Sequence, residues 1–487
     1  MKRRLCTGLA LLTAGTLLLS GCASAGKMLS TDAYPGACGE AYLPIDENTE
    51  VDASDESTIT FSLKVDTAAY SNVARYLNNG QLPPTDAVRT EELLNYFRYE
   101  EPLEPADGAP FAIYTELGPS PLHDNRQLAF IRVKTPEIDK SELPPCNLTF
   151  LIDTSGSMDS YDKLPLLKTA FGLLVETLTE NDRVSIVTYA GSSQIVLDSA
   201  SGADKTAILD AIYNLTASGS TAGADGIQTA YSLAAKNFKE GGNNRVILAT
   251  DGDFNVGIQN TDDLASFIGE KRDSGVYLSI LGFGTGNIRD DIMETLSKNG
   301  NGNYAYIDTV QTAKKVLVEE LGGNLFTVAD DVKAQVVFDP DMVQSYRLIG
   351  YENRLLNNQD FADDRKDAGE IGAGTDVVAL FEIQLTDSGR SGNPFAVHIR
   401  YKDPGGTESR LVTKDTLDSG LDTPASTDFG FACSVAVFGH LLRGSEHIGT
   451  ATLQTAISYA QDNVGRDPGG YRQDYVALLE QYQRLVK

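Results

Sequence analysis

The most constraining feature of this sequence is a stretch, residues 147–321, in which apolar strands alternate with amphipathic helices. Apolar residues recur at helical spacing between the strands, as Leu167, Ala170, Phe171 and Leu174 do. The strands are expected at residues 148–152, 184–189, 246–249, 277–283 and 304–307. Such alternation predicts an α/β fold built on a doubly wound, mostly parallel sheet.

The pattern on either side of this stretch differs. After Asn324 apolar residues alternate with a period of two, at 332–338, 381–385 and 395–401, which predicts a flanking antiparallel β-sandwich. Helical segments are expected at both ends of the chain, and the strands before Asn147 are expected to join those after Asn324. The predicted regions are a signal peptide at 1–21, an acidic tether at 22–57, N-terminal helices and strands at 58–140, the α/β domain at 145–323, the sandwich at 324–420 and C-terminal helices at 426–487.

Oxygen-bearing side chains follow two strands of the predicted parallel sheet. Asp153 and Asp251 each come directly after a buried strand, and Ser155 and Ser157 follow Asp153 at spacings of two. Thr221 lies in a loop that reaches the same edge. Because ligands bind at the carboxyl ends of parallel strands, these groups are expected to converge. Two carboxylates and three hydroxyls form a hard-oxygen set, which suits Mg²⁺ and leaves Mn²⁺ and Ca²⁺ open.

These residues resemble a known family. The run Asp153-Thr154-Ser155-Gly156-Ser157, together with Thr221 and Asp251, is similar to the metal-ion-dependent adhesion site of von Willebrand factor type A (VWA) domains. The resemblance implies that all five residues contribute to one divalent-cation site with a position left for a partner's Asp or Glu carboxylate. The flanking motifs, such as Gly80-Gln81-Leu82-Pro83-Pro84, resemble those of bacterial lipoproteins that carry this domain.

The N-terminus has the organisation of a lipoprotein signal. Basic residues at positions 2–4 precede the short apolar run 9–19, which ends in Leu19-Ser20-Gly21-Cys22. This quartet resembles the bacterial lipobox, which implies cleavage before Cys22 and acylation of its thiol. Ala23, in place of Asp, favours the outer membrane by resemblance to Gram-negative lipoproteins. The expected location is therefore the cell envelope, with the chain attached to the membrane by lipid.

Charge and cysteine content narrow the possible partners. The formal net charge is -28, which disfavours nucleic acid and anionic lipid headgroups. Cys38, Cys146 and Cys433 remain after Cys6 and Cys22 are assigned to the signal and the anchor. No spacing among them matches a zinc site, so buried or free thiols with at most one disulfide are expected.

Three other functions were weighed against metal-dependent protein binding. A hydrolase with Ser155 as nucleophile lacks the Gly-x-Ser-x-Gly elbow, and none of the four histidines lies in the α/β domain; they are His123, His398, His440 and His447. The last two are expected at the surface. A role beside an ATP-driven complex is known for some VWA proteins, but this chain contains no phosphate-binding loop motif. A structural envelope scaffold that uses no metal is the main alternative, and no enzymatic activity is expected.

Overall fold

The computed structural model describes residues 39–64, 66–100, 103–105, 108–138, 144–219, 224–252, 261–320, 323, 325–366, 368–390 and 392–487. The signal peptide, Cys22, Cys38 and Thr221 lie outside the described residues. No helix in the part of the chain that the structure describes combines the length and the apolar composition needed to cross a membrane.

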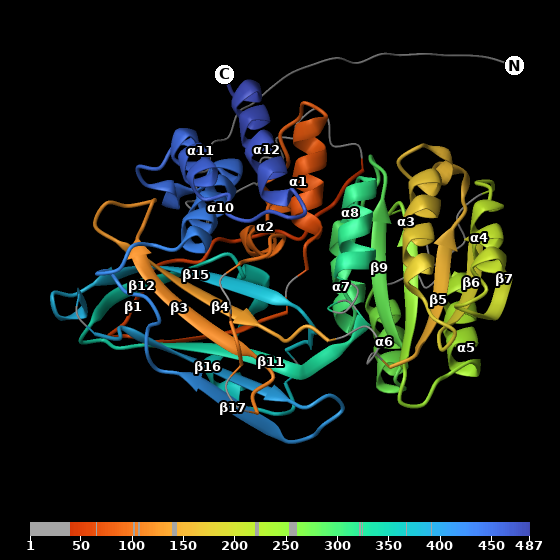
Figure 1. Ribbon diagram of the computed structural model, residues 1–487, viewed down its shortest axis with the longest axis horizontal. Coiled ribbons are helices and arrows are strands. Elements are labelled where there is room, and N and C mark those ends of the chain that lie inside the picture. The colour runs from red at the N-terminus through yellow and green to blue at the C-terminus, as the bar shows by residue number, and fades with distance from the viewer. Residues whose placement is uncertain are drawn as a thin grey trace, which may run out of the picture. The chain divides into compact units, whose positions relative to one another are not determined.

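The α/β region contains a six-stranded sheet in the order β10-β9-β8-β5-β6-β7 (Figure 1). Its strands are β5 (Cys146–Asp153), β6 (Arg183–Ala190), β7 (Ser192–Ser201), β8 (Asn243–Thr250), β9 (Tyr277–Phe283) and β10 (Tyr304–Ile307). Five of them run parallel, and β7 pairs antiparallel with β6 at the edge. The residues of β5 and β8 are buried throughout, as expected for strands covered on both faces.

Helices cover both faces of this sheet. One face packs against α3 (Leu164–Thr177), α4 (Lys205–Tyr213) and α8 (Val310–Lys314), which continues into a π-helical turn, η4 (Lys315–Glu319). The other packs against α5 (Ala224–Lys236), α6 (Thr261–Asp273) and α7 (Asp290–Asn299). The doubly wound arrangement that the sequence predicted is therefore confirmed.

The flanking strands form two antiparallel sheets that share one core. The first sheet contains β1 (Val51–Asp52), β12 (Val343–Ile349), β15 (Asp376–Leu385), β4 (Gln127–Lys134) and β3 (Ala112–Pro119). The second contains β13 (Leu355–Leu356), β2 (Thr58–Ser62), β11 (Thr327–Phe338), β16 (Phe395–Lys402) and β17 (Ser409–Lys414), with β14 (Ile371–Gly372) beside β11. Because β2 pairs with β11 and β4 pairs with β15, strands from before and after the α/β region build one sandwich. The α/β domain is inserted between them, as expected.

Five helices from the two ends of the chain form a layer on the first sheet (Figure 1). They are α1 (Ala68–Asn78), α2 (Thr90–Asn95), α10 (Thr427–Arg443), α11 (Leu453–Asp462) and α12 (Tyr471–Leu485). The alternation along β4 explains how one sheet serves two cores: Leu128 and Phe130 face these helices, whereas Ala129 and Ile131 face the sandwich interior.

Two predictions need correction. Residues 39–57 were expected to belong to the tether, but they lie on the folded body, because β1 pairs with β12 and Glu50 pairs with Arg126. His440 was expected at the surface and is only 3% exposed, because α10 lies in the core of the helical layer.

Buried ion pairs connect the α/β domain to the rest of the chain. Arg89, just before α2, lies 2.6 Å from Asp290 of α7 and 2.5 Å from Glu92. Arg354 lies 3.3 Å from Glu294 of α7 and 3.1 Å from Asp66. All six side chains are buried, so α7 is held by charge as well as by packing.

Candidate metal site

Four of the five predicted site residues lie at the carboxyl-terminal edge of the parallel sheet. Asp153 ends β5, and Asp251 directly follows β8, the neighbouring parallel strand. Both carboxylates are fully buried. Thr221 is outside the described residues, so its place relative to them stays a prediction. We call this edge, with residues 153–157, 218–219, 251–252 and 284–289, the metal edge.

The turn after β5 arranges the two serines around Asp153. The backbone N–H of Ser155 donates to Oδ1 of Asp153 at 2.8 Å, and the hydroxyls of Ser155 and Ser157 lie 3.0 Å apart. Ser155 is buried, whereas Ser157 is exposed. The side-chain oxygens thus run from the buried end of the strand toward the surface at Ser157.

The same turn is tied to the loop that precedes Thr221. The N–H of Gly156 donates to the carbonyl of Gly219 at 3.0 Å, and the N–H of Ser218 donates to the carbonyl of Thr154 at 2.8 Å. A Cβ at position 156 would lie 3.3 Å from the carbonyl oxygen of Gly219, so a larger residue would crowd this contact. The loop therefore reaches the turn two residues before Thr221.

Asp153 has the electrostatic character of a cation ligand. Burial raises the pKa of Asp153 to about 6; the hydrogen bonds from Ser155 oppose this rise, and the negative charge of Asp251 adds to it. Its Oδ2 atom is buried and accepts no geometrically sound hydrogen bond among the described residues, although the Tyr189 hydroxyl is close enough to interact with the carboxylate. A buried carboxylate oxygen of this kind is costly unless a proton or a cation compensates it.

Lys163 is a site residue that the sequence analysis missed. Its Nζ lies 2.8 Å from Oδ2 of Asp251, and the pair is buried. The side chain passes over Gly284, where a Cβ would lie 2.3–2.8 Å from three of the lysine carbons. The sequence could have pointed to it, because Lys163 is a basic residue at the end of the turn after Ser157, just before α3.

The set of donors fits a hard divalent cation. Two carboxylates and two hydroxyls are in place, and the described residues contain no group of three or more His, Cys, Asp and Glu side chains that would hold a metal by itself. The described donors at this edge are oxygen atoms of carboxylates and hydroxyls, which is the kind of set that Mg²⁺ prefers and zinc does not. Cys146 and Cys433 are free and buried. Burial raises the pKa of both thiols, which disfavours the thiolate form that a metal would need.

The histidines lie outside the α/β domain. His123 is in the turn between β3 and β4, where Nδ1 lies 2.9 Å from Glu382; His398 is on β16, His440 on α10 and His447 just after it. Ser155 therefore has no histidine from its own domain to act as a general base.

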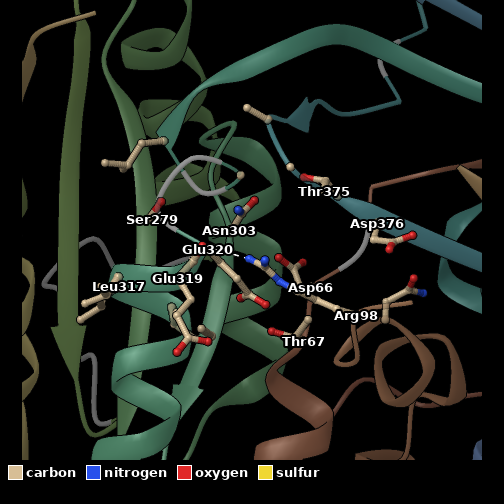
Figure 2. Close-up of a pocket in the computed structure, with 18 of the residues that line it drawn as sticks. Asp66, Thr67, Arg98, Ser279, Asn303, Leu317, Glu319, Glu320, Thr375 and Asp376 are labelled. Atoms are coloured by element: carbon tan, nitrogen blue, oxygen red, sulfur yellow. Dashed lines mark hydrogen bonds between the residues drawn. The ribbon is translucent and has the colours of Figure 1, made fainter. Parts of the chain in front are cut away.

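A separate cavity of about 220 Å³ lies where the α/β domain, the sandwich and the helical layer meet. Figure 2 shows Arg98, Glu319, Glu320 and Asp376 around it, and Arg98 donates to the carbonyl of Glu319 at 3.0 Å. Carboxylates are among the side chains that line it. We assign it no chemistry.

Comparison with known proteins agrees with this architecture. The family profile described as "von Willebrand factor type A domain" matches residues 147–319, the profile described as "von Willebrand factor" matches residues 37–129, and the profile described as "Uncharacterized protein YfbK, C-terminal" matches residues 323–485. YfbK of Escherichia coli (strain K12) is 43% identical over 483 residues, which cover 94% of this chain and 83% of YfbK. The chain belongs to the YfbK family. Its α/β domain is a VWA domain, and it carries the YfbK C-terminal region after it.

Other relatives of this YfbK-family chain are more distant. The protein sll0103 of Synechocystis sp. is 31% identical over 188 residues, which cover 39% of this chain and 43% of that protein. A solved von Willebrand factor type A structure from Catenulispora acidiphila is 16% identical, covers 79% of this chain and 91% of its own, and has a TM-score of 0.43. The presence of a VWA domain points to protein interaction or adhesion as the general role of the YfbK-family chain.

Proposed function

We propose that this chain is an envelope lipoprotein whose VWA domain holds a divalent cation, Mg²⁺ before Mn²⁺ or Ca²⁺, and binds a protein through the partner's Asp or Glu carboxylate. One observation carries the proposal. The buried Asp153 carboxylate, with only the nearby Tyr189 hydroxyl toward its Oδ2 among the described residues, begins the turn that carries the Ser155–Ser157 hydroxyl pair and lies on the same edge as Asp251.

Each residue has a distinct part in this proposal. Asp153 and Asp251 supply the charge that balances a dication. Ser155, Ser157 and Thr221 add neutral oxygens, which leave the ion attractive to a further anionic ligand. A bound cation would supply a Lewis-acidic position for the partner's carboxylate oxygen. The backbone N–H of Ser155 holds the Asp153 carboxylate in place for this role.

The test is calorimetry on residues 39–487 with Mg²⁺, Mn²⁺ and Ca²⁺, paired with partner capture from cell envelopes with and without EDTA. We expect heat and a raised melting temperature with at least one cation, and partner capture that EDTA abolishes. Asp153→Ala and Thr221→Ala should remove both. If no cation gives heat or a melting shift, the metal-dependent function is wrong.

Membrane attachment through Cys22 is part of the same proposal, and so is the outer membrane as the location. The basic segment, the apolar run and the lipobox-like quartet support the anchor, and Ala23 after Cys22 supports the outer membrane. Several acyl chains on one residue hold a protein stably, since each buried methylene contributes about 0.8 kcal/mol. Labelling with a palmitate analogue should mark wild type and leave Cys22→Ala unmarked. Equal labelling of both would rule the anchor out.

A second candidate function is a scaffold that never uses a metal. The Lys163–Asp251 pair favours it, because the ammonium satisfies one buried carboxylate without any ion. Partner capture that is the same in Mg²⁺ and in EDTA, and the same in Asp153→Ala, would support the scaffold over the adhesion site.

A further inference from the structure

The first described residues of the chain lie on the metal edge. We call residues 39–45 the strap. The N–H of Ala41 donates to the carbonyl of Ile288 at 2.9 Å, and the N–H of Gly286 donates to Oε1 of Glu40 at 2.8 Å. Arg75 of α1 holds both carboxylate oxygens of Glu40, at 3.0 and 2.8 Å. The strap is therefore fixed between the helical layer and the loop after β9.

That loop is in direct contact with the site residues. A Cβ at Gly252, next to Asp251, would lie 2.6–2.8 Å from backbone atoms of residues 287–289. A Cβ at Gly284 would meet the side chain of Lys163. The strap therefore contacts the same loop that packs against Gly252, the residue after Asp251.

The length of chain before the strap limits the distance to the proposed anchor. Sixteen residues lie between Cys22 and Gly39, and the fully extended chain from one to the other spans at most about 60 Å. The opposite edge of the sheet is one strand further away, roughly 26 Å for an eight-residue strand. The chain that leads to the proposed anchor thus meets the VWA domain at the metal edge and not at the opposite edge of the sheet.

We propose that the metal edge works on the membrane side of the molecule, and that its partner is a protein embedded in or anchored to the same membrane. This inference rests on the proposed function, and it adds where the partner is. The partner presents an Asp or Glu side chain within about 60 Å of the surface, the reach of the extended chain. A lipid phosphate is the poorer ligand, because a chain of net charge -28 is repelled by an anionic surface.

Two exposed aromatic residues give a matched pair of probe positions. Tyr161 is 86% exposed and lies in the turn between Ser157 and α3, on the metal edge. Phe238 is 45% exposed and lies between α5 and β8, where its ring faces Gly275 just before β9, so it marks the opposite edge.

The first arm measures orientation. A donor dye is attached to p-azidophenylalanine at position 161 or 238 of the full acylated protein, which is bound to phosphatidylcholine vesicles with acceptor dye on the headgroups. We expect about twofold more energy transfer from position 161, given the roughly 26 Å between the edges. Equal transfer, or more from position 238, overturns the inference. Failure to attach to the vesicles counts instead against the proposed anchor.

The second arm identifies the class of partner. p-Benzoylphenylalanine at position 161 is photo-crosslinked in intact cells with and without EDTA, and position 238 serves as the control. Crosslinks from position 161 to membrane proteins that EDTA removes support the inference. Crosslinks to soluble envelope proteins alone, or to lipid alone, overturn it. Crosslinks that EDTA leaves unchanged contradict the metal-dependent function itself.

Discussion

The ammonium of Lys163 lies 2.8 Å from Oδ2 of Asp251, and both residues are buried at the metal edge. The lysine comes from the turn after β5, and the aspartate follows β8, 88 residues further along the chain. The Lys163 ammonium therefore contacts one of the two carboxylates that the proposed metal needs, so a bound metal would compete with it for Asp251.

Lys163→Met should raise metal affinity and weaken the metal-free protein. Loss of the ammonium leaves Asp251 buried without its partner charge, which costs about 3–5 kcal/mol. Removal of the competing cation should tighten Mg²⁺ binding by about tenfold, or 1.4 kcal/mol. Calorimetry gives the affinity, and melting with EDTA or Mg²⁺ gives the stability; the shift on adding Mg²⁺ should exceed that of wild type.

Lys168→Met is the matched control for this change. Lys168 lies in α3 and donates to the backbone carbonyls of Tyr213 and Leu215. Among the described residues it forms no ion pair with a carboxylate. Its metal affinity should equal that of wild type. Weaker Mg²⁺ binding in Lys163→Met would mean that the lysine supports the cation site and does not compete with the cation.

Asp153→Asn should keep the hydrogen bond of the turn after β5 and remove metal binding. The amide oxygen can still accept the N–H of Ser155, and the buried charge beside Asp251 is gone. Because burial raises the pKa of Asp153 to about 6, we expect the variant in EDTA to be more stable than wild type by about 1–3 kcal/mol. The stabilisation by Mg²⁺ should vanish. Urea unfolding with and without Mg²⁺ measures both effects.

Asp159→Asn is the comparison for that experiment. Asp159 is exposed, two residues beyond Ser157. It should keep the Mg²⁺ effect in full. A Mg²⁺ effect that survives Asp153→Asn would show that the cation binds elsewhere.

The sequence predicted the parts of the fold that depend on local pattern. The bounds of β9 and β10 match the expected strands at 277–283 and 304–307, because buried apolar runs between polar turns are visible one strand at a time. β7 was missed, since this serine-rich edge strand is largely half-exposed and lacks a clear alternation. Its pairing with β6 comes from the hairpin at Gly191, which has φ 71°.

Contacts between distant segments were beyond the sequence pattern. Residues 39–57 resembled a tether because their acids have no local partners, but Glu47 pairs with Arg443 and Glu50 with Arg126 across the fold. His440 resembled a surface residue near a helix end, and only tertiary packing buries α10. The Asp-x-Ser-x-Ser turn was predictable because its residues are neighbours in sequence, whereas the Lys163–Asp251 pair was not.

His440 should make the stability of the protein fall at acid pH. Burial, and after it the positive charge of Arg347, lower the pKa of His440 to about 4. The ring is held neutral, with Nδ1 2.8 Å from the carbonyl of Ala436 and Nε2 3.3 Å from Arg347. The unfolded chain binds a proton below about pH 6.5 that the folded chain takes up only near pH 4. Stability is therefore present above pH 6.5 and is lost as the pH falls toward 4.

The predicted size of this effect is about 2 kcal/mol between roughly pH 7.5 and pH 5. Urea unfolding at the two pH values measures it. His440→Gln should lose less stability than wild type over that interval by this amount. His398→Gln, at a partly exposed position on β16, should behave as wild type. An unchanged slope in His440→Gln would show that carboxylates alone set the acid sensitivity.

Arg89 should control how firmly the VWA domain is held to the helical layer. Its guanidinium lies 2.6 Å from Asp290 of α7 and 2.5 Å from Glu92, and it is 1% exposed. Burial raises the pKa of Asp290, and Arg89 opposes that rise. Arg89→Met leaves both carboxylates buried without the guanidinium. This should lower the free energy of unfolding by about 3–5 kcal/mol. The chain has no Trp and 21 Tyr, so tyrosine fluorescence follows urea unfolding.

The matched control is Arg98→Met, because Arg98 lies 3.7 Å from Glu137 with both side chains at least half-exposed. An exposed pair of this kind contributes about 0–1 kcal/mol. We expect Arg89→Met to unfold in two transitions, with the VWA domain released before the sandwich, and Arg98→Met to unfold as wild type does. The double variant Arg89→Met with Asp290→Leu should recover part of the loss, since it replaces the unpaired charge by apolar contact. Equal unfolding of Arg89→Met and Arg98→Met would mean that apolar packing alone joins the domains.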